Sequence, residues 1–291
     1  MPANLRLFRI RAFSAGNLAG FTMALARGGL QFMIVIWLQG IWLPLHGYSF
    51  VRTPLWAGIY MLPLTAGFLI AGPISGALSD RFGSRGLATG GAALTGGAFL
   101  GLMLLPVNFP YLVFALLLAL IGAATGMFAS PNSSSIMGSV PAAERGVASG
   151  MRSTFQNSGT AISIAVFFTL VIAGLASSLP TTLDAGLLHA GVPHAVAAKL
   201  AALPPVSSMF GALLGINPLE HLLSQHHALH YLSPAGRQAL TGRAFFPHLI
   251  SAPFNDGLVV VFATAGGLSA VAAVASLMRG SVLTTTQGAS T

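Results

Sequence analysis

Long apolar tracts separated by short polar turns run along most of the chain. Six tracts have the roughly 20 mostly apolar residues that a helix needs to cross a hydrocarbon core of roughly 30 Å. They are Phe13–Leu38, Leu55–Leu78, Leu87–Leu105, Tyr111–Ser130, Val147–Leu175 and Asp256–Met278. This pattern predicts an all-α membrane protein with six transmembrane helices.

The stretch 176–255 breaks the pattern. It holds eight prolines and seven of the eight histidines, and no window of 20 residues in it is free of prolines, charges and histidines together. We therefore expect a long extracytoplasmic loop there. It would separate five transmembrane helices at 13–175 from a sixth at 256–279, with cytoplasmic segments at 1–12 and 280–291.

The arginines predict the orientation of these spans. With the N-terminus in the cytoplasm, the short outer loops contain only Arg52. The inner segments then contain Arg6, Arg9, Arg11, Arg81, Arg85, Arg145, Arg152 and Arg279. Because short cytoplasmic loops of membrane proteins carry an excess of basic residues, both termini are expected in the cytoplasm, in a multi-pass protein of the plasma or inner membrane.

Composition agrees with a bilayer and excludes other classes. Only 6% of residues are charged, against about a quarter in soluble proteins. The net charge of +8 comes with a single lysine, Lys199, so the positive-inside bias explains it better than nucleic-acid binding does. The chain has no cysteine for disulfides or thiolate metal sites. No nucleophile–base pattern, phosphate loop or nucleotide motif is present, so we expect no enzyme and no cofactor.

The histidines of the expected outer loop allow three interpretations. His226 and His230 are four residues apart and could share a helix face, with His221 and His227 nearby. A metal site would need more ligands of the right type, and no Asp/Glu cluster accompanies them. pH-sensitive packing of the loop is a second interpretation. Plain surface histidines, and no metal, are favoured over both.

The turn between the second and third tracts carries the sharpest local pattern, Gly76-Ala-Leu-Ser-Asp80-Arg81-Phe-Gly83-Ser-Arg85-Gly. Asp80 could pair with Arg81 or Arg85, or cap the next helix. Gly83 permits a left-handed turn, and Gly76 permits close packing against a neighbouring helix. An ordinary charged turn that obeys the positive-inside bias is the alternative.

This turn resembles the G-x-L-a-D-R-x-G-r-R motif of major facilitator superfamily transporters. A second turn, which contains Glu144, Arg145 and Gly146, resembles the P-x-x-x-R-G-x-a-s-G turn before the eleventh core helix of that family. The N-terminal segments Leu5–Arg9 and Ala15–Leu18 are similar to the entry of the seventh core helix in the drug:proton antiporter branch of that family, whose members have about 14 spans.

The resemblance implies that the chain is the C-terminal six-helix half of such a transporter. Family members place two six-helix bundles around a central cavity and bind substrate near the bilayer midplane. The implied activity is proton-coupled export of small apolar or drug-like molecules by alternating access. The implied partners are membrane lipid, a small-molecule substrate, and a missing N-terminal half or a second copy. A homodimeric half-transporter and a truncated membrane protein without transport stay open as alternatives.

Arg27 is the strongest candidate for the lining of a substrate cavity. It lies near the middle of the first tract, where a charge costs several kcal/mol unless it faces a cavity or a partner. Gln31 follows four residues later and shares its helix face. If the span slips towards residues 31–45, Arg27 would instead lie near the inner interface.

The fifth tract carries a polar inner portion with Gln156 and Asn157 as further cavity candidates. Interhelical hydrogen bonds of about 0.6 kcal/mol each are an equal alternative for these residues. No carboxylate lies at the middle of any of the six tracts. The counter-ion of Arg27 and the proton carrier are therefore expected from the missing half.

Overall fold

The computed structural model describes residues 5–202 and 245–279, together with positions 204, 206, 211, 240 and 242. All regular elements in this part of the chain are helices. The histidines at 221, 226, 227 and 230, and the expected C-terminal segment at 280–291, lie outside the described residues.

Six helical runs among the described residues are long and apolar enough to cross a membrane. The first run is α1 (Arg11–Trp37), which continues through the π-helix η2 (Leu38–Trp42) and α2 (Leu43–Leu45). The second run consists of α3 (Thr53–Tyr60) and α4 (Leu62–Phe82). The other four are α5 (Ser84–Met103), α6 (Tyr111–Gly138), α7 (Arg145–His189) and α12 (Phe245–Leu277). Short elements are η1 (Leu5–Arg9), η3 (Ala142–Glu144) and α8 (His194–Ala201). The predicted six-helix, all-α membrane fold is confirmed.

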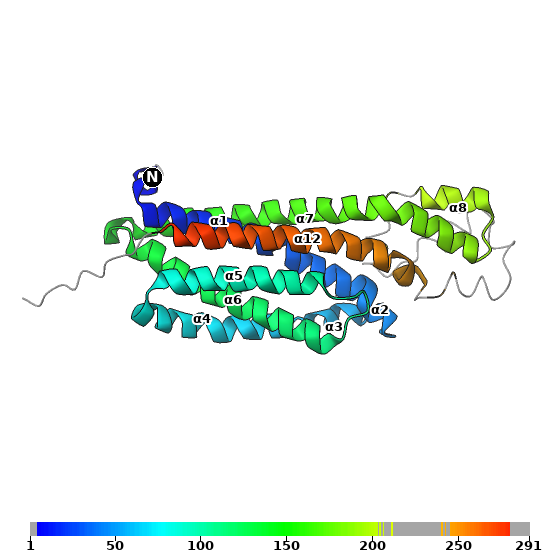
Figure 1. Cartoon of the computed structure of the whole chain (residues 1–291), viewed down its shortest axis with the longest axis horizontal. Coiled ribbons are helices and arrows are strands. Elements are labelled where there is room, and N and C mark those ends of the chain that lie inside the picture. The colour runs from blue at the N-terminus through cyan, green and yellow to red at the C-terminus, as the bar shows by residue number, and fades with distance from the viewer. Residues whose placement is uncertain are drawn as a thin grey trace, which may run out of the picture.

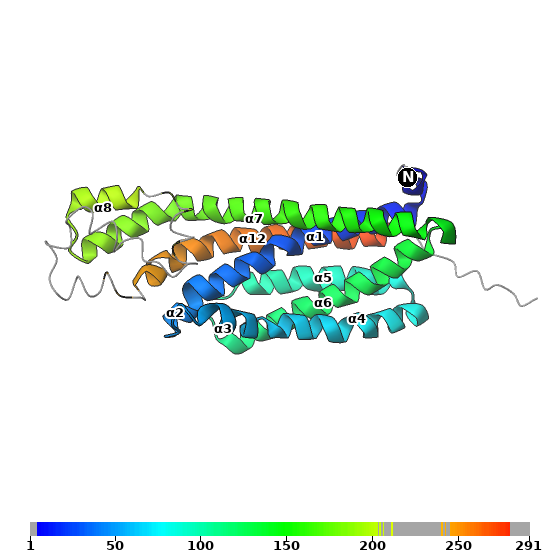
Figure 2. The same cartoon turned by 180° about the vertical axis from the view of Figure 1, so that it is seen from behind.

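The six runs form two groups of three helices. Helices α4 and α5 pack on α6, and helices α7 and α12 pack on α1. The groups meet where α12 packs on α5 and α1 packs on α6 (Figures 1 and 2). The packing of α4 on α6 in one group therefore corresponds to the packing of α7 on α1 in the other group. This is the relation expected of two inverted three-helix repeats within one transporter half.

Glycines bring the backbones of α4 and α6 into contact. A methyl group added at Gly126 would lie 2.9 Å from the backbone nitrogen of Gly72 and from the backbone oxygen of Phe68. A methyl group at Gly122 would collide with the backbone of Leu64. Lipid-embedded helices gain no hydrophobic driving force from each other, so such close backbone approach supplies much of their association.

Helices α1 and α7 also meet at backbone distance, through one serine. Ser163 of α7 accepts a hydrogen bond from the backbone nitrogen of Gly29 at 2.8 Å and donates one to the backbone oxygen of Leu25. A methyl group at Gly29 would lie 2.5 Å from the backbone oxygen of Ser163. This contact fixes the rotation of α1 about its own axis.

Helices α7 and α12 are longer than the sequence predicted. Helix α7 continues past Leu175 to His189, and α12 begins at Phe245 rather than at Asp256. The expected loop at 176–255 is therefore helical at both of its ends.

A buried leucine stripe explains the extension. It packs against the first turns of α12 and consists of Leu175, Leu179, Leu183 and Leu187. Pro180 lies on the exposed side of α7 and does not end the helix. With 45 residues, α7 is about 67 Å long, so it projects with α8 beyond the other helices (Figure 1).

Replacement of Gly126 by Ala tests the α4–α6 contact. The added methyl group meets backbone atoms that cannot rotate away, so we expect a loss of about 1–3 kcal/mol of stability. The matched control is Gly97→Ala on α5, where nothing lies within 4 Å of the added group. There the better helix propensity of Ala predicts an equal or higher midpoint. Thermal unfolding in detergent measures both, and equal midpoints for the two variants would contradict the contact.

Candidate functional site

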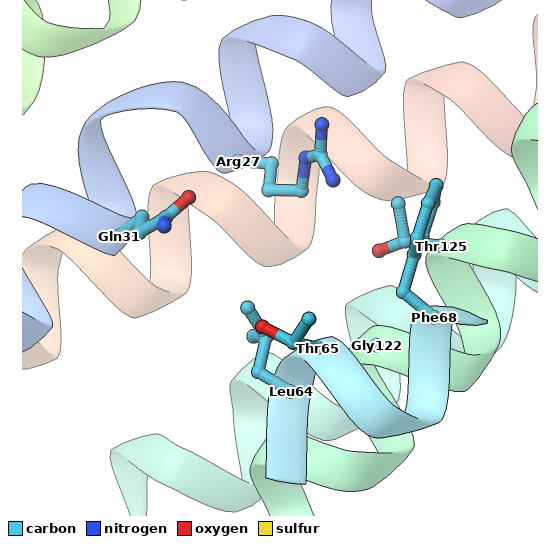
Figure 3. A pocket seen from close by; sticks show the side chains of 7 residues that line it. All are labelled: Arg27, Gln31, Leu64, Thr65, Phe68, Gly122 and Thr125. Carbon is cyan, nitrogen blue, oxygen red and sulfur yellow. The ribbon is translucent and has the colours of Figure 1, made fainter. Parts of the chain in front are cut away.

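A half-open pocket of about 180 Å³ lies between α1, α4 and α6. Its lining consists of Arg27, Gln31, Leu64, Thr65, Phe68, Gly122 and Thr125. Figure 3 shows Arg27 and Gln31 projecting from α1 towards the residues contributed by α4 and α6. The structure thus brings two of the sequence-predicted cavity residues together.

The pocket lies at the middle of the bundle. Arg27, Thr65 and Thr125 each stand near the midpoint of their own helical run, at 11–45, 53–82 and 111–138. Three independent helices therefore agree on the level of the pocket. This agreement favours the central position of Arg27 over the alternative in which the first span slips outward.

The polar groups of the pocket are unpaired among the residues that the structure describes. Thr125 is only 4% exposed, and its Oγ1 atom has no hydrogen-bond partner there. Within the same described part, the side chains of Arg27, Gln31 and Thr65 also make no hydrogen bond. A buried donor without a partner costs about 1–3 kcal/mol. The Thr125 hydroxyl is therefore a donor that an acceptor in the pocket would stabilise, whereas the side chains of Arg27, Gln31 and Thr65 are exposed.

Gln156 and Asn157, the other two predicted cavity residues, lie elsewhere. Gln156 is half-buried on α7 and approaches Gly20 of α1, about 10 Å along the helix from Arg27. Asn157 is exposed. Neither residue lines the pocket.

The Asp80 turn has the backbone that the sequence predicted but not the ion pair. Gly83 has a φ of +83°, and a methyl group at Gly76 would lie 2.8 Å from the Ser130 Oγ atom of α6. Asp80, Arg81 and Arg85 are exposed and unpaired within the described chain, and Gly83 begins α5 without a side-chain cap. The sequence allowed an Asp80 ion pair or cap as well as an ordinary charged turn, and neither the pair nor the cap is formed among the described residues. In the last turn of α4, the Asp80 carboxylate also faces the negative end of the helix dipole.

The second predicted turn lies at the same end of the bundle. Glu144 closes η3 and directly precedes α7, whose first residues are Arg145 and Gly146. A carboxylate at a helix N-terminus is favourable, so Glu144 helps to start α7. Arg145 and Gly146 are exposed.

Comparison with known proteins assigns the fold. The family model described as Major Facilitator Superfamily matches residues 2–164, more than half of the chain. The chain belongs to the major facilitator superfamily. The resemblance carried by the two turns is thereby confirmed.

The relatives of this major facilitator chain are transport and resistance proteins. The tetracenomycin C resistance and export protein of Streptomyces glaucescens is 25% identical over 278 residues, which cover 94% of this chain and 45% of that protein. The methyl viologen resistance protein SmvA of Salmonella typhimurium is 32% identical over 243 residues, 81% of this chain and 46% of that protein. The riboflavin transporter RibZ of Clostridioides difficile is 28% identical over 164 residues, 56% of this chain and 34% of that protein. The chain spans less than half the length of each.

A buried polar contact that the sequence pattern did not indicate lies at the end of the bundle that holds the N-terminus. There Arg279, which the sequence suggested only as an inner positive charge, is 4% exposed and donates from Nη2 to the Asn132 Oδ1 atom of α6. Its Nε and Nη1 atoms and the Asn132 Nδ2 atom have no partner among the described residues. Next to it, the Arg11 Nε atom donates to the backbone oxygen of Met278 at 2.6 Å. These contacts tie the end of α12 to α1 and α6 in this major facilitator bundle.

Substitutions at Arg279 and Asn132 test this contact. Asn132→Leu leaves the buried guanidinium unpaired, so we expect a loss of about 2 kcal/mol, or about 5 °C in the unfolding midpoint. Arg279→Met removes the charge but leaves the buried Asn132 amide without its partner, so we expect a smaller loss than for Asn132→Leu. The double variant leaves neither polar group buried and unpaired, and it should be neutral or stabilising. Additive losses in thermal unfolding would show that the two side chains do not interact.

Proposed function

We propose that this chain supplies one of the two six-helix bundles of a secondary active exporter. The exporter would move small apolar or drug-like molecules across the cell membrane by alternating access, driven by a proton gradient. One observation carries the proposal: a half-open pocket at the middle of the bundle whose polar groups lack partners. The names of the relatives, which describe export, resistance and transport, support the same class of cargo.

The size and exposure of the pocket support a second bundle. Sites for drug-sized ligands usually enclose about 300–1,000 Å³, and this pocket encloses about 180 Å³. The second bundle would close the open side and complete the cavity, as the two halves of family members do. It could be a separate N-terminal half or a second copy of this chain, because the two halves of the family are parallel repeats.

The exposed surface of α4 supports the same arrangement. Large apolar side chains along it have no cover within the described chain; they are Leu62, Phe68, Leu69, Ile70, Ile74, Leu78 and Phe82. In a membrane such a surface contacts lipid or another helix bundle. The unpaired Asp80 turn at its end would then meet the second bundle and act as a contact on the cytoplasmic side.

The charge distribution supports a cytoplasmic location for both termini. The first residues of α1, the Asp80 turn, the η3 turn and the end of α12 share one end of the bundle (Figures 1 and 2). Most arginines belong to these segments, as the positive-inside bias requires of cytoplasmic loops. The α8 end would then face outward.

The proton carrier would come from the second bundle. The described carboxylates are Asp80, Glu144, Asp184 and Asp256. Asp80 and Glu144 lie at helix ends, Asp184 lies in the projecting part of α7, and Asp256 is exposed on α12. None of them lines the Arg27 pocket, so the described part of this bundle has no protonatable acid at its cavity wall.

Deletion of the coding segment from its host tests the proposal with any second bundle still present. We expect slower energy-dependent efflux of riboflavin, methyl viologen or tetracenomycin C, and full restoration by the unaltered chain. Collapse of the proton gradient with a protonophore should stop the restored efflux. Arg27→Gln should restore at most a tenth of the rate, because this bundle's wall of the cavity then lacks its one charged group.

The control for that experiment is Gly97→Ala, which should restore efflux fully, with membrane abundance of each variant checked by immunoblotting. Equal efflux of all three compounds with and without the chain would contradict the exporter and favour a membrane protein without transport. Efflux that survives the protonophore would contradict proton coupling.

A further inference from the structure

The pocket carries positive charge and no negative charge among its lining residues. Among the lining residues of the Arg27 pocket the only ionisable side chain is Arg27 itself. A guanidinium stays protonated at any physiological pH and offers five N–H donors in a planar fork. The described carboxylates lie away from the pocket, so the described part of this bundle leaves the positive charge uncompensated.

The pocket also has a second donor that lacks an acceptor. The Thr125 Oγ1 atom is buried and unpartnered in the described chain, and it lines the same pocket. Figure 3 shows the Thr125 hydroxyl and the Arg27 guanidinium facing each other across the gap between α1 and α6. A fork of N–H groups beside a hydroxyl is suited to the two oxygens of one carboxylate, because such pairs bind in bidentate fashion.

Beside these donors, and apart from the polar side chains of Gln31 and Thr65, the lining is apolar. Phe68 is 37% exposed beside Thr125, and Leu64 lies one helical turn before it on α4. Gly122 contributes no side chain at the floor, where α4 and α6 touch. An aromatic ring can stack on Phe68 in such a space.

We propose that this pocket binds an aromatic substrate that carries a carboxylate or a similar oxyanion, with Arg27 and Thr125 holding its oxygens and Phe68 contacting its ring. The inference rests on the proposed role of the pocket as the substrate cavity and names the class of substrate. On this bundle's side of the cavity a cation would meet the repulsion of Arg27, so this bundle by itself favours an anion.

Binding to de-energised membrane vesicles from the host tests this inference, with vesicles from the deletion strain as the blank. Three radiolabelled probes share one ring and differ in charge: naphthalene-2-carboxylate, naphthalene-2-carboxamide and 2-naphthylmethylammonium. We expect the carboxylate to bind at least about tenfold more tightly than the amide, as a hydrogen-bonded charge pair allows. The ammonium probe should bind most weakly.

Variants assign the preference to the pocket. Arg27→Gln should reduce the carboxylate affinity to that of the amide, and Arg27→Lys should retain part of the difference. Thr125→Val keeps the shape of the side chain and should weaken the carboxylate about threefold or more while changing the amide less. Arg52→Gln removes an exposed positive charge outside the pocket and should leave all three affinities unchanged.

Several outcomes would overturn the inference: equal affinities for the three probes, a preference for the amide or the ammonium, an unchanged ratio in Arg27→Gln, or no saturable binding. An unchanged ratio would mean that a carboxylate of the second bundle neutralises Arg27. Efflux of cations alone would be consistent with the proposed exporter and would contradict only the proposed substrate class. Selective carboxylate binding without any efflux would support the proposed ligand class and contradict the proposed export function.

Discussion

The backbone contact between α1 and α7 is the constraint on which the candidate site depends. Ser163 bridges the backbone of Leu25 and Gly29, so that this face of α1 is held against α7. Successive residues of a helix are rotated by about 100°. Arg27 therefore points away from α7 and towards α4 and α6, whose own backbones touch at their glycines. A charge held in this direction, at the middle of a membrane bundle, needs a cavity or a partner.

The fold followed from hydropathy, but the ends of two helices did not. Apolar tracts of about 20 residues are dictated by the thickness of the bilayer, and all six appear as helices. Pro180 and the histidines indicated a loop after Leu175. A proline inside a helix removes one hydrogen bond and crowds the carbonyl group four residues earlier, at a cost of about 3 kcal/mol. The buried stripe that includes Leu179 and Leu183 outweighs that cost. Tertiary contact with α12 decides the outcome, and local composition does not reveal it.

Only part of the candidate site could be predicted from the sequence, because tertiary contacts also decide which residues meet there. Arg27 and Gln31 could be paired because they are four residues apart on one helix. Nothing in the sequence around Thr65 or Thr125 marks them as site residues. They lie near Arg27 only because α4 and α6 both lie beside α1 at the pocket. Gln156 shares the face of α7 that contains Ser163 and therefore faces α1. It meets α1 near Gly20, which is closer to the N-terminus of α1 than Arg27 is. Arg279 looked like a cytoplasmic charge, although its long side chain reaches back into the bundle to Asn132.

The most direct test of the account asks whether the Arg27 pocket faces water or lipid. The chain contains no cysteine, so a single Thr65→Cys variant reports on the pocket, and Val260→Cys, which is exposed near the middle of α12, is the matched control. In host membranes, a charged methanethiosulfonate reagent should modify Thr65→Cys and not Val260→Cys, because thiolates form in water and not in hydrocarbon. If neither cysteine reacts, the pocket is open to lipid, and a substrate cavity shared with a second bundle is contradicted.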